Sequence, residues 1–304
     1  MKHLLVAGLI NLETTLRIEE FPVPYFPVRY PFNGVRSTVS GVGFNLATAL
    51  TRLGSPIRFL SLIGNDPVGG LVRHALSTEG IDGEHILPIL SETPQSVILY
   101  DAYGKRQINV DLKEIQETPF PASSFLPALD NASMAALCNV NFTRPFLREA
   151  RHRGIPVATD VHAISSLDDA YNLDYLQAAD ILFASDEALG RPPEDWAREV
   201  ISRFPARIVV VGMGRRGAML VTREDGIAGT FPAVFTRPVK NTIGAGDALF
   251  SAFLHGLTKG ADPVRALRRA MLFASWKIGE TGAAMGLLSE SSLLDLERNI
   301  QSDS

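Results

Sequence analysis

The sequence predicts an α/β protein with an open, mostly parallel, doubly wound sheet and a small β-sheet lid. Short apolar runs alternate with amphipathic stretches of helical period along most of the 304 residues, a pattern typical of parallel strands covered by helices on both faces. Two stretches break this alternation, residues 14–37 and 95–112, and we assign them to the lid. Because no repeat or linker divides the chain, we expect a single domain over 1–304.

The expected elements follow one another in alternating order. Predicted strands of the main sheet occupy 3–9, 57–63, 134–138, 155–160, 180–183 and 206–212, and predicted helices occupy 42–53, 66–80, 144–153, 193–203, 246–258, 262–279 and 290–299. Local signals support several helix ends. Asp66 is a typical N-cap residue and Pro67 suits the first helical position, while Gly54 and Gly80 suit the position after a helix.

The two irregular stretches have the composition of β structure. Residues 14–37 are rich in Pro, Phe, Tyr and Val, and 95–112 has the pattern of a hairpin with its turn at 101–104. Long excursions from a compact domain are often functional, so we expect a lid over a ligand site, with plain surface loops as the alternative. An isolated two-stranded layer is marginal in water. A homodimer that pairs two lids would bury the apolar side chains of the layer, and a monomer whose lid packs on the main sheet is the alternative. These side chains are Phe26, Tyr30, Phe32 and Ile108.

The composition is that of a globular protein and argues against several functions. Hydrophobic residues make up 46% of the chain, charged residues 20%, and the net charge is −4. A mildly negative chain is not expected to bind nucleic acid or anionic membranes through charge, and no apolar run approaches the ~20 residues that span a bilayer. The single cysteine, Cys138, excludes an intrachain disulfide and indicates a reducing compartment, which we take to be the cytoplasm.

The most informative segment is Asn241-Thr-Ile-Gly-Ala-Gly-Asp247, which directly precedes an apolar helix. The backbone N–H groups of Gly244, Ala245 and Gly246 are expected at the positive end of that helix, where they can bind an anion. Asp247 follows in the first turn. Amides that hold a phosphoryl group beside a carboxylate that accepts a hydroxyl proton are what phosphoryl transfer requires. A tight turn in which Asp247 only offsets the helix dipole is the structural alternative.

Two further glycine-rich segments open candidate ligand sites. In Ser40-Gly-Val-Gly-Phe-Asn45, Gly41 permits close approach to the backbone and Asn45 offers a donor and an acceptor. The segment from Gly212 to Gly217 fits G-x-G-x-x-G, but a predicted strand follows it instead of a helix, which argues against a dinucleotide fingerprint. A β-turn-β that lines a nucleotide is compatible with the segment.

Together these segments resemble the ribokinase-like family of sugar and nucleoside kinases, the PfkB carbohydrate kinases. Asn241-Thr-Ile-Gly-Ala-Gly-Asp247 is similar to the family signature D-T-x-G-A-G-D. The segment Gly41-Val-Gly-Phe-Asn45-Leu-Ala looks like the other signature, G-G-x-x-x-N-x-A, and is followed by Arg52-Leu-Gly and by Gly64-Asn-Asp-Pro-Val-Gly69.

The resemblance implies an ATP-dependent kinase that uses Mg²⁺–ATP to phosphorylate a hydroxyl of a small sugar. It assigns Asp247 as the general base and the Gly244–Gly246 amides as the anion hole. The implied substrate contacts are Asn11, Glu13, Gly41, Asn45 and Asn141, and the implied nucleotide contacts are Gly212, Gly214, Gly217, Ser275 and Gly282.

The sequence departs from the family pattern at several of these positions. Asn241 replaces the first Asp of the signature, which puts activation by a monovalent cation in doubt. Glu13 replaces an Asp of ribokinases and is one methylene longer, and Asn141 occupies the approximate place of an acidic sugar contact. The sugar pocket is therefore not that of a plain ribokinase. Ser185-Asp-Glu-Ala188 stands in place of the N-x-x-E segment that organises Mg²⁺, and Asp186 or Glu187 could substitute as the metal ligand. A nucleoside kinase and a catalytically impaired relative that binds a sugar or nucleotide are the alternative functions.

Overall fold

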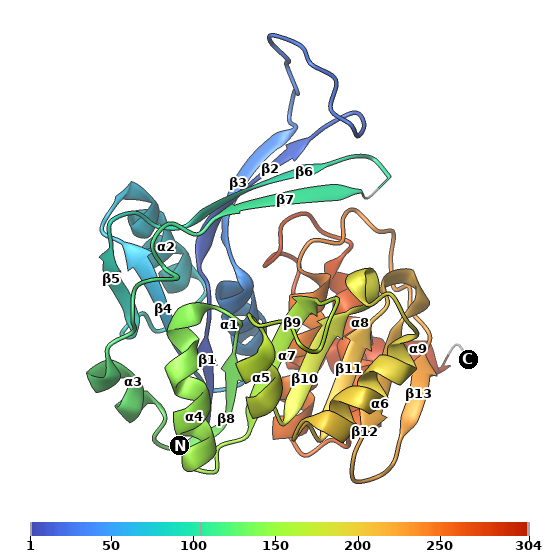
Figure 1. Cartoon of the computed structure of the whole chain (residues 1–304). Helices are drawn as coiled ribbons and strands as arrows, with labels where there is room; N and C mark the ends of the chain where they lie inside the picture. Colours follow the sequence, from blue (N-terminus) through green and yellow to red (C-terminus); the bar gives the residue numbers. More distant parts are fainter. Residues whose placement is uncertain (1, 104, 303–304) are drawn as a thin grey trace.

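The computed structural model describes residues 2–103 and 105–302 and contains two separate sheets (Figure 1). The larger sheet has nine strands in the order β13-β12-β11-β10-β9-β8-β1-β4-β5. Their bounds are β1 (His3–Ala7), β4 (Ile57–Gly64), β5 (Ile86–Leu90), β8 (Ala132–Leu137), β9 (Val157–Ala163), β10 (Ile181–Ser185), β11 (Ile208–Gly212), β12 (Ala218–Thr222) and β13 (Ala228–Phe231). Neighbours from β5 to β11 are parallel, whereas β12 and β13 are antiparallel. The predicted open, mostly parallel sheet is confirmed.

Helices cover both faces of this sheet. One face carries α3 (Ala122–Ala128), α4 (Arg144–His152), α5 (Leu173–Ala178) and α6 (Pro193–Arg203), and the other carries α1 (Val42–Arg52), α2 (Pro67–Thr78), α7 (Ala245–Thr258), α8 (Pro263–Lys277) and α9 (Glu290–Ser302). In β1, Leu5 and Leu4 belong to the two opposite cores, because successive side chains of a strand point to opposite faces. None of the helices in the described ranges is long and apolar enough to cross a membrane.

Most predicted elements are present with small shifts at their ends, and the Asp66 carboxylate accepts a hydrogen bond from the Gly69 N–H at 2.7 Å, as expected of an N-cap. The sequence analysis misses four short elements: β5, β13, α3 and α5. Pro88 lies in β5 and Pro127 in α3, while β13 has only four residues and α5 only six. None of the four therefore offers a sustained apolar period.

The smaller sheet, which we term the lid sheet, has four strands in the order β3-β2-β6-β7. They are β2 (Asn11–Arg17), β3 (Val35–Ser40), β6 (Gln95–Tyr100) and β7 (Arg106–Asp111). The antiparallel pair β6-β7 confirms the predicted hairpin, although residue 104 of its turn lies outside the described part. The central pair β2-β6 is parallel. β2 and β3 extend beyond 14–37 at both ends, because β2 follows closely on β1 and β3 runs directly into α1.

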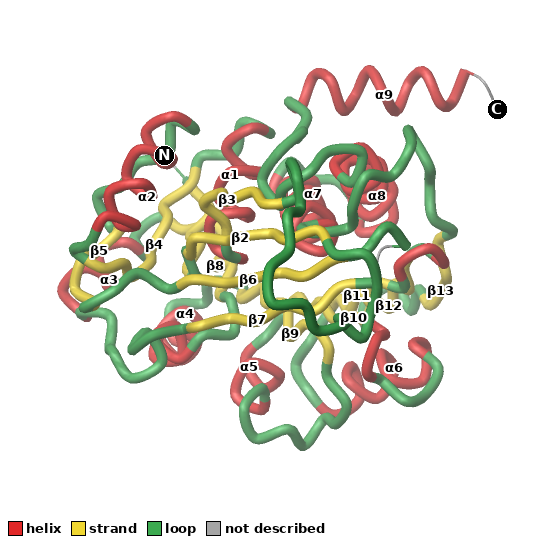
Figure 2. The backbone as a smooth tube through the Cα atoms, turned by 90° about the horizontal axis from the view of Figure 1, so that it is seen from above, coloured by secondary structure: helices red, strands yellow, loops and turns green. Residues whose placement is uncertain are grey.

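The lid sheet stands over the carboxyl ends of the main strands, and its strands cross the centre of the molecule when seen from above (Figures 1 and 2). Ile98 of the lid is buried with Ile243 and Ala283 of the body. The 18–34 loop projects away from the body, and Phe32 in it is 89% exposed. Four lid side chains that the sequence analysis expects to be buried are exposed in the single chain: Phe26, Tyr30, Phe32 and Ile108.

Candidate active site

Three segments meet beneath the lid sheet at the carboxyl end of the main sheet. β2 carries Glu13, the first turn of α1 carries Asn45, and the first turn of α7 carries Asp247. The last two are brought together because α1 and α7 pack on the same face of the sheet. Open α/β folds bind their ligands at this edge. The structure thus gathers residues that the sequence analysis assigned to substrate and base from distant segments.

Hydrogen bonds link these residues in a chain. The Asn45 amide donates through Nδ2 to Asp247 Oδ2 at 2.7 Å. The Ser40 hydroxyl donates to Glu13 Oε2 at 3.0 Å and lies 3.4 Å from Asn45 Oδ1. Glu13, Asn45 and Asp247 were singled out from the sequence, whereas Ser40 was assigned no role there. Its position between Glu13 and Asn45 assigns it a bridging role.

Burial shapes the electrostatics of both carboxylates. It raises the pKa of Asp247, and the hydrogen bond from Asn45 opposes this rise by favouring the ionised form. Burial also raises the pKa of Glu13, and the hydrogen bond from Ser40 opposes it. A carboxylate whose pKa is moved toward neutral pH is a better proton acceptor than an exposed aspartate. Asp247 therefore has the environment of a general base.

Two buried acceptor atoms in this cluster have no hydrogen-bond partner within the described residues: Asn11 Oδ1 and Glu13 Oε1. The other end of the Asn11 amide is satisfied, because Nδ2 donates to Ser96 Oγ at 2.9 Å. An unsatisfied buried polar group costs about 1–3 kcal/mol. Both atoms would be satisfied by a ligand that brings O–H or N–H donors, and a polyol brings several.

The turn before α7 presents backbone amides beside Asp247. Gly244 has φ 74°, and a Cβ at this position would lie 2.7 Å from the carbonyl oxygen of Ala283, so only glycine fits. The Ala245 N–H donates to Thr242 O at 3.2 Å. The N–H groups of Gly244 and Gly246 make no hydrogen bond within the described residues. These two amides are therefore free for an anion, while Ala245 is committed to the turn.

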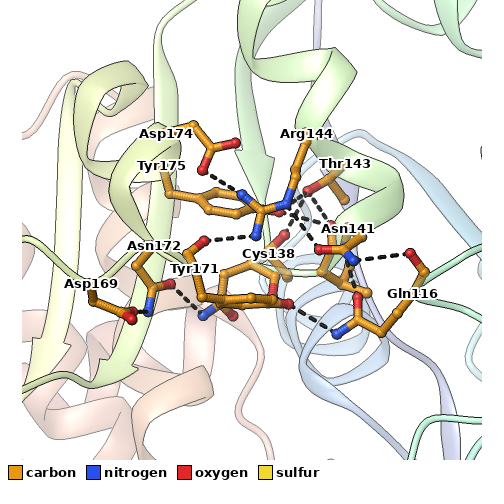
Figure 3. A network of polar contacts seen from close by, with 12 residues as sticks. Gln116, Cys138, Asn141, Thr143, Arg144, Asp169, Tyr171, Asn172, Asp174 and Tyr175 are labelled. Atoms are coloured by element: carbon orange, nitrogen blue, oxygen red, sulfur yellow. Dashed lines mark hydrogen bonds and ion pairs between the residues drawn. The ribbon is translucent and has the colours of Figure 1, made fainter.

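Asn141 lies in a separate polar network (Figure 3). It begins the short helical turn η1 (Asn141–Thr143). Its N–H donates to Gln116 Oε1 at 2.9 Å, its Nδ2 donates to the Gln116 carbonyl at 3.0 Å, and its Oδ1 accepts from Arg144 Nε at 2.9 Å. These contacts hold the loop that precedes α3 against the start of α4, and none of them involves Glu13, Asn45 or Asp247. The role of Asn141 as a substrate contact stays a prediction.

The predicted nucleotide contacts come from two regions. Gly212 ends β11, and Gly214 and Gly217 lie in or directly after the turn η3 (Gly214–Arg216), which leads into antiparallel β12. This β-turn-β is what the sequence analysis expected in place of a dinucleotide fingerprint. Ser275 is buried in α8, where its Oγ accepts from the Thr236 N–H at 2.9 Å. Gly282 lies in the loop after α8 with φ 88°.

The two candidate metal ligands follow β10 in the turn η2 (Asp186–Ala188). Each carboxylate contacts an arginine: Asp186 pairs with Arg216, and Glu187 Oε1 lies 3.5 Å from Arg106 Nη2. Within the described ranges no group of three or more His, Cys, Asp or Glu side chains could enclose a metal ion. Mg²⁺ is commonly held by one or two carboxylates together with substrate phosphates, so two neighbouring carboxylates at this edge fit that ion.

Two lid arginines were missed by the sequence analysis. Arg106 of β7 donates to Thr242 Oγ1 at 2.9 Å, beside the turn that carries the Gly244 and Gly246 amides, and Arg36 of β3 donates to Thr281 Oγ1 at 2.6 Å. These two contacts join the lid sheet to the body. A cavity of about 330 Å³ lies where lid and body meet, and Arg17, Arg106 and Lys240 are among the residues that line it. No local motif could reveal these contacts, because each joins residues more than a hundred positions apart.

Comparison with known proteins agrees with this geometry. Residues 1–289 match the pfkB family carbohydrate kinase description, so the chain belongs to the pfkB family of carbohydrate kinases, which are phosphotransferases. An acarbose 7(IV)-phosphotransferase from an Actinoplanes species is 27% identical over 292 residues, covering 95% of this chain and 96% of that protein. An ATP-dependent ribose-1-phosphate kinase from Halopiger xanaduensis is 28% identical over 286 residues, covering 93% and 94%.

Solved structures show the same fold. A microbiome-derived acarbose kinase superposes with a TM-score of 0.85 at 27% identity, covering 97% of this chain and 98% of that one. A ribokinase from Arabidopsis thaliana, solved with ribose and ATP, superposes with a TM-score of 0.81 at 21% identity, covering 97% and 99%. The predicted ribokinase-like architecture with a separate small sheet is therefore confirmed.

The Asn45–Asp247 hydrogen bond leads to a first prediction. Asn45→Ala should weaken binding of the phosphoryl acceptor by about fivefold, the value of one hydrogen bond of about 1 kcal/mol, and leave ATP affinity nearly unchanged. Calorimetric titration with each ligand measures both. Asn109→Ala is the matched control, because Asn109 lies on an exposed lid strand and donates to Val97 O. Equal losses for both ligands would make Asn45 a purely structural residue.

Proposed function

We propose that the protein transfers the γ-phosphoryl group of ATP to a hydroxyl group of a small sugar. The observation that carries this proposal is the pair of unpartnered buried acceptors, Asn11 Oδ1 and Glu13 Oε1, next to the partly buried carboxylate of Asp247 with two free amides beside it. The acceptors call for a ligand with several hydroxyl donors. The names of the relatives, which phosphorylate acarbose and ribose 1-phosphate, agree with a sugar or sugar derivative as the acceptor.

In this mechanism the acceptor hydroxyl is held by Asn11, Glu13, Asn45 and the backbone at Gly41. Asp247 Oδ2 is engaged by Asn45, so Oδ1 is the oxygen that takes the hydroxyl proton. The hydroxyl oxygen then forms its bond to the γ-phosphorus as the bond to the β–γ bridging oxygen breaks, and ADP leaves with that electron pair. The Gly244 and Gly246 amides donate to the oxygens of the group in transfer. Ala245 keeps the turn in shape.

The nucleotide is assigned to Gly212, Gly214, Gly217, Ser275 and Gly282. With ATP, Asp186 or Glu187 would hold Mg²⁺ jointly with the phosphates, where the ion would offset phosphate charge. The turn at Asn241 does not reproduce the acidic residue of the family's cation loop, so a monovalent cation is not assigned. We place the reaction in the cytoplasm, in keeping with the single buried thiol of Cys138.

The acceptor class is tested by ATP consumption over a panel of monosaccharides, sugar phosphates, oligosaccharides and nucleosides. We expect turnover with a member of the first three groups and none with nucleosides. Turnover with nucleosides alone would replace the sugar kinase by a nucleoside kinase. Melting shifts with ligands but no turnover anywhere would favour a catalytically impaired relative.

The role of Asp247 leads to a second prediction. Asp247→Asn should lower kcat by about 10²-fold or more, the scale of a general-base contribution, with acceptor affinity less affected. Because the base must be ionised and burial raises its pKa above 3.8, wild-type kcat should fall with decreasing pH at a midpoint above that value. The acidic limb should be absent from the residual activity of the variant.

Asp225→Asn is the matched control for this measurement, because Asp225 is an exposed loop residue far from α7 in the chain. It should retain both kcat and the acidic limb. A near wild-type kcat for Asp247→Asn would remove Asp247 from the mechanism.

We also infer that the lid sheet closes over the acceptor and pairs with the lid of a second copy. β7 is an edge strand, and its residues Ile108 and Val110 are about half exposed. Aromatic side chains of the 18–34 loop are exposed as well. A second lid would cover both the apolar surface and the open edge. Closure would exclude water from the transferable phosphoryl group.

A third prediction follows from this lid pairing. Wild-type protein should have the mass of a dimer by light scattering, and Ile108→Glu should have the mass of a monomer. Ile89→Glu is the matched control, since Ile89 is equally exposed on the edge strand β5 of the main sheet. Hydrogen exchange over 95–112 should slow when acceptor binds. A monomeric wild type would exclude lid pairing, and slow exchange that no bound ligand changes would exclude lid closure.

A further inference from the structure

Lys277, the last residue of α8, is fully buried beneath the turn that carries the anion-binding amides. Lysine is almost never fully buried unless its ammonium group has partners. Its Nζ donates to the carbonyl oxygen of Ile243. Ile243 directly precedes Gly244, so the lysine contacts the peptide group that supplies the first amide of the proposed anion hole.

Because of the geometry of a peptide group, this contact also orients the Gly244 N–H. The C=O of Ile243 and the N–H of Gly244 belong to one planar trans unit and point in opposite directions. A donor that holds the carbonyl oxygen on one side therefore aims the Gly244 N–H toward the other side. Asn241 Oδ1 accepts from the Ile243 N–H at 3.2 Å, and Ala283 packs against Gly244. The turn is thus held at three successive points, and Lys277 supplies the charged contact among these three, while Arg106 holds the neighbouring Thr242.

Charged groups from three elements act on Lys277. The pKa of Lys277 is lowered to about 8, mainly by burial and to a smaller extent by Arg106 on β7, while the carboxylates of Asp247 on α7 and Glu13 on β2 oppose this shift. At neutral pH most molecules therefore retain the ammonium charge. In turn, the lysine favours the ionised forms of both carboxylates. The two nearby carboxylates balance the charge of the buried lysine, which explains why it is tolerated inside the protein. The contact with the Ile243 carbonyl indicates its role in the site.

We propose that Lys277 is a positioning residue of phosphoryl transfer, which aims the Gly244 N–H at the transferred group by holding the Ile243 carbonyl. The proposal rests on the proposed kinase function. Lys277 touches neither the acceptor nor the reacting atoms in this scheme; it acts through the backbone. Its effect should therefore be seen in kcat and in γ-phosphate binding, with little change in acceptor binding.

The test compares Lys277→Met, which keeps the length of the side chain without donor or charge, with Lys277→Arg, which keeps both. Removing an oxyanion donor lowers kcat by about 10²–10³-fold, and a misaimed donor should lower it at least about tenfold. We expect this loss in Lys277→Met with acceptor KM within about threefold, and a smaller loss in Lys277→Arg. Lys259→Met is the control, because Lys259 is an exposed residue at the far end of α7.

Two further readouts separate positioning from other roles. Calorimetry should show weaker binding of a nonhydrolysable ATP analogue to Lys277→Met, by about tenfold, with ADP binding within about twofold, because only the analogue carries a γ-phosphate. The kcat deficit should persist from about pH 6 to about pH 7.5, where the lysine, with its pKa of about 8, is mostly charged. A deficit that shrinks toward zero as the pH rises over this range would mean that Lys277 only sets the pKa of Asp247, and this outcome would overturn the proposal.

The test of Lys277 can be read independently of whether the proposed kinase function is correct. If the wild type phosphorylates no compound of the panel, the kinase proposal fails, and the comparison of the ATP analogue with ADP still tests Lys277. Equal binding of the analogue by wild type and Lys277→Met would overturn the positioning role. Should the Met variant not fold, as judged by its melting temperature, Lys277→Gln repeats the comparison.

Discussion

The hydrogen bond between Asn45 and Asp247 joins two parts of the chain that lie 202 residues apart. It forms because α1 and α7 pack on the same face of the main sheet and both begin at its carboxyl edge. The bond holds one carboxylate oxygen of Asp247 and leaves the other free. The free amides of Gly244 and Gly246 lie beside Asp247 because they precede it directly in the chain. The rest of the site is arranged around this pair.

The lid sheet contributes directly to the substrate side of the site. β2 carries Asn11 and Glu13, whose unpartnered oxygens support the proposed acceptor site. The position of these oxygens therefore depends on the position of the lid sheet. Arg36 and Arg106 join that sheet to the loops at Thr281 and Thr242. Closure of the lid and assembly of the acceptor site are consequently one event in the proposed mechanism.

The departure from the family signature at Asn241 has a structural explanation. Its side-chain oxygen accepts from the Ile243 N–H, a role that requires an acceptor and no charge. Lys277 and Arg106 bring positive charge to this turn, because Lys277 donates to the Ile243 carbonyl and Arg106 donates to Thr242 Oγ1. An amide at position 241 thus keeps the shape of the turn before α7 without adding a negative charge to it.

The sequence by itself determined most strands of the main sheet, its longer helices, the lid hairpin and the Gly-Ala-Gly-Asp turn, because each is encoded by a local period or by adjacent residues. It also separated the 212–217 segment from a dinucleotide site, since a strand pattern follows it. Only the tertiary structure decided that Ser40 bridges Glu13 and Asn45, that Arg106 reaches Thr242, and that Lys277 holds Ile243. These contacts join residues 27, 136 and 34 positions apart. Spacing along the chain cannot reveal them, because the packing of whole elements sets which side chains meet.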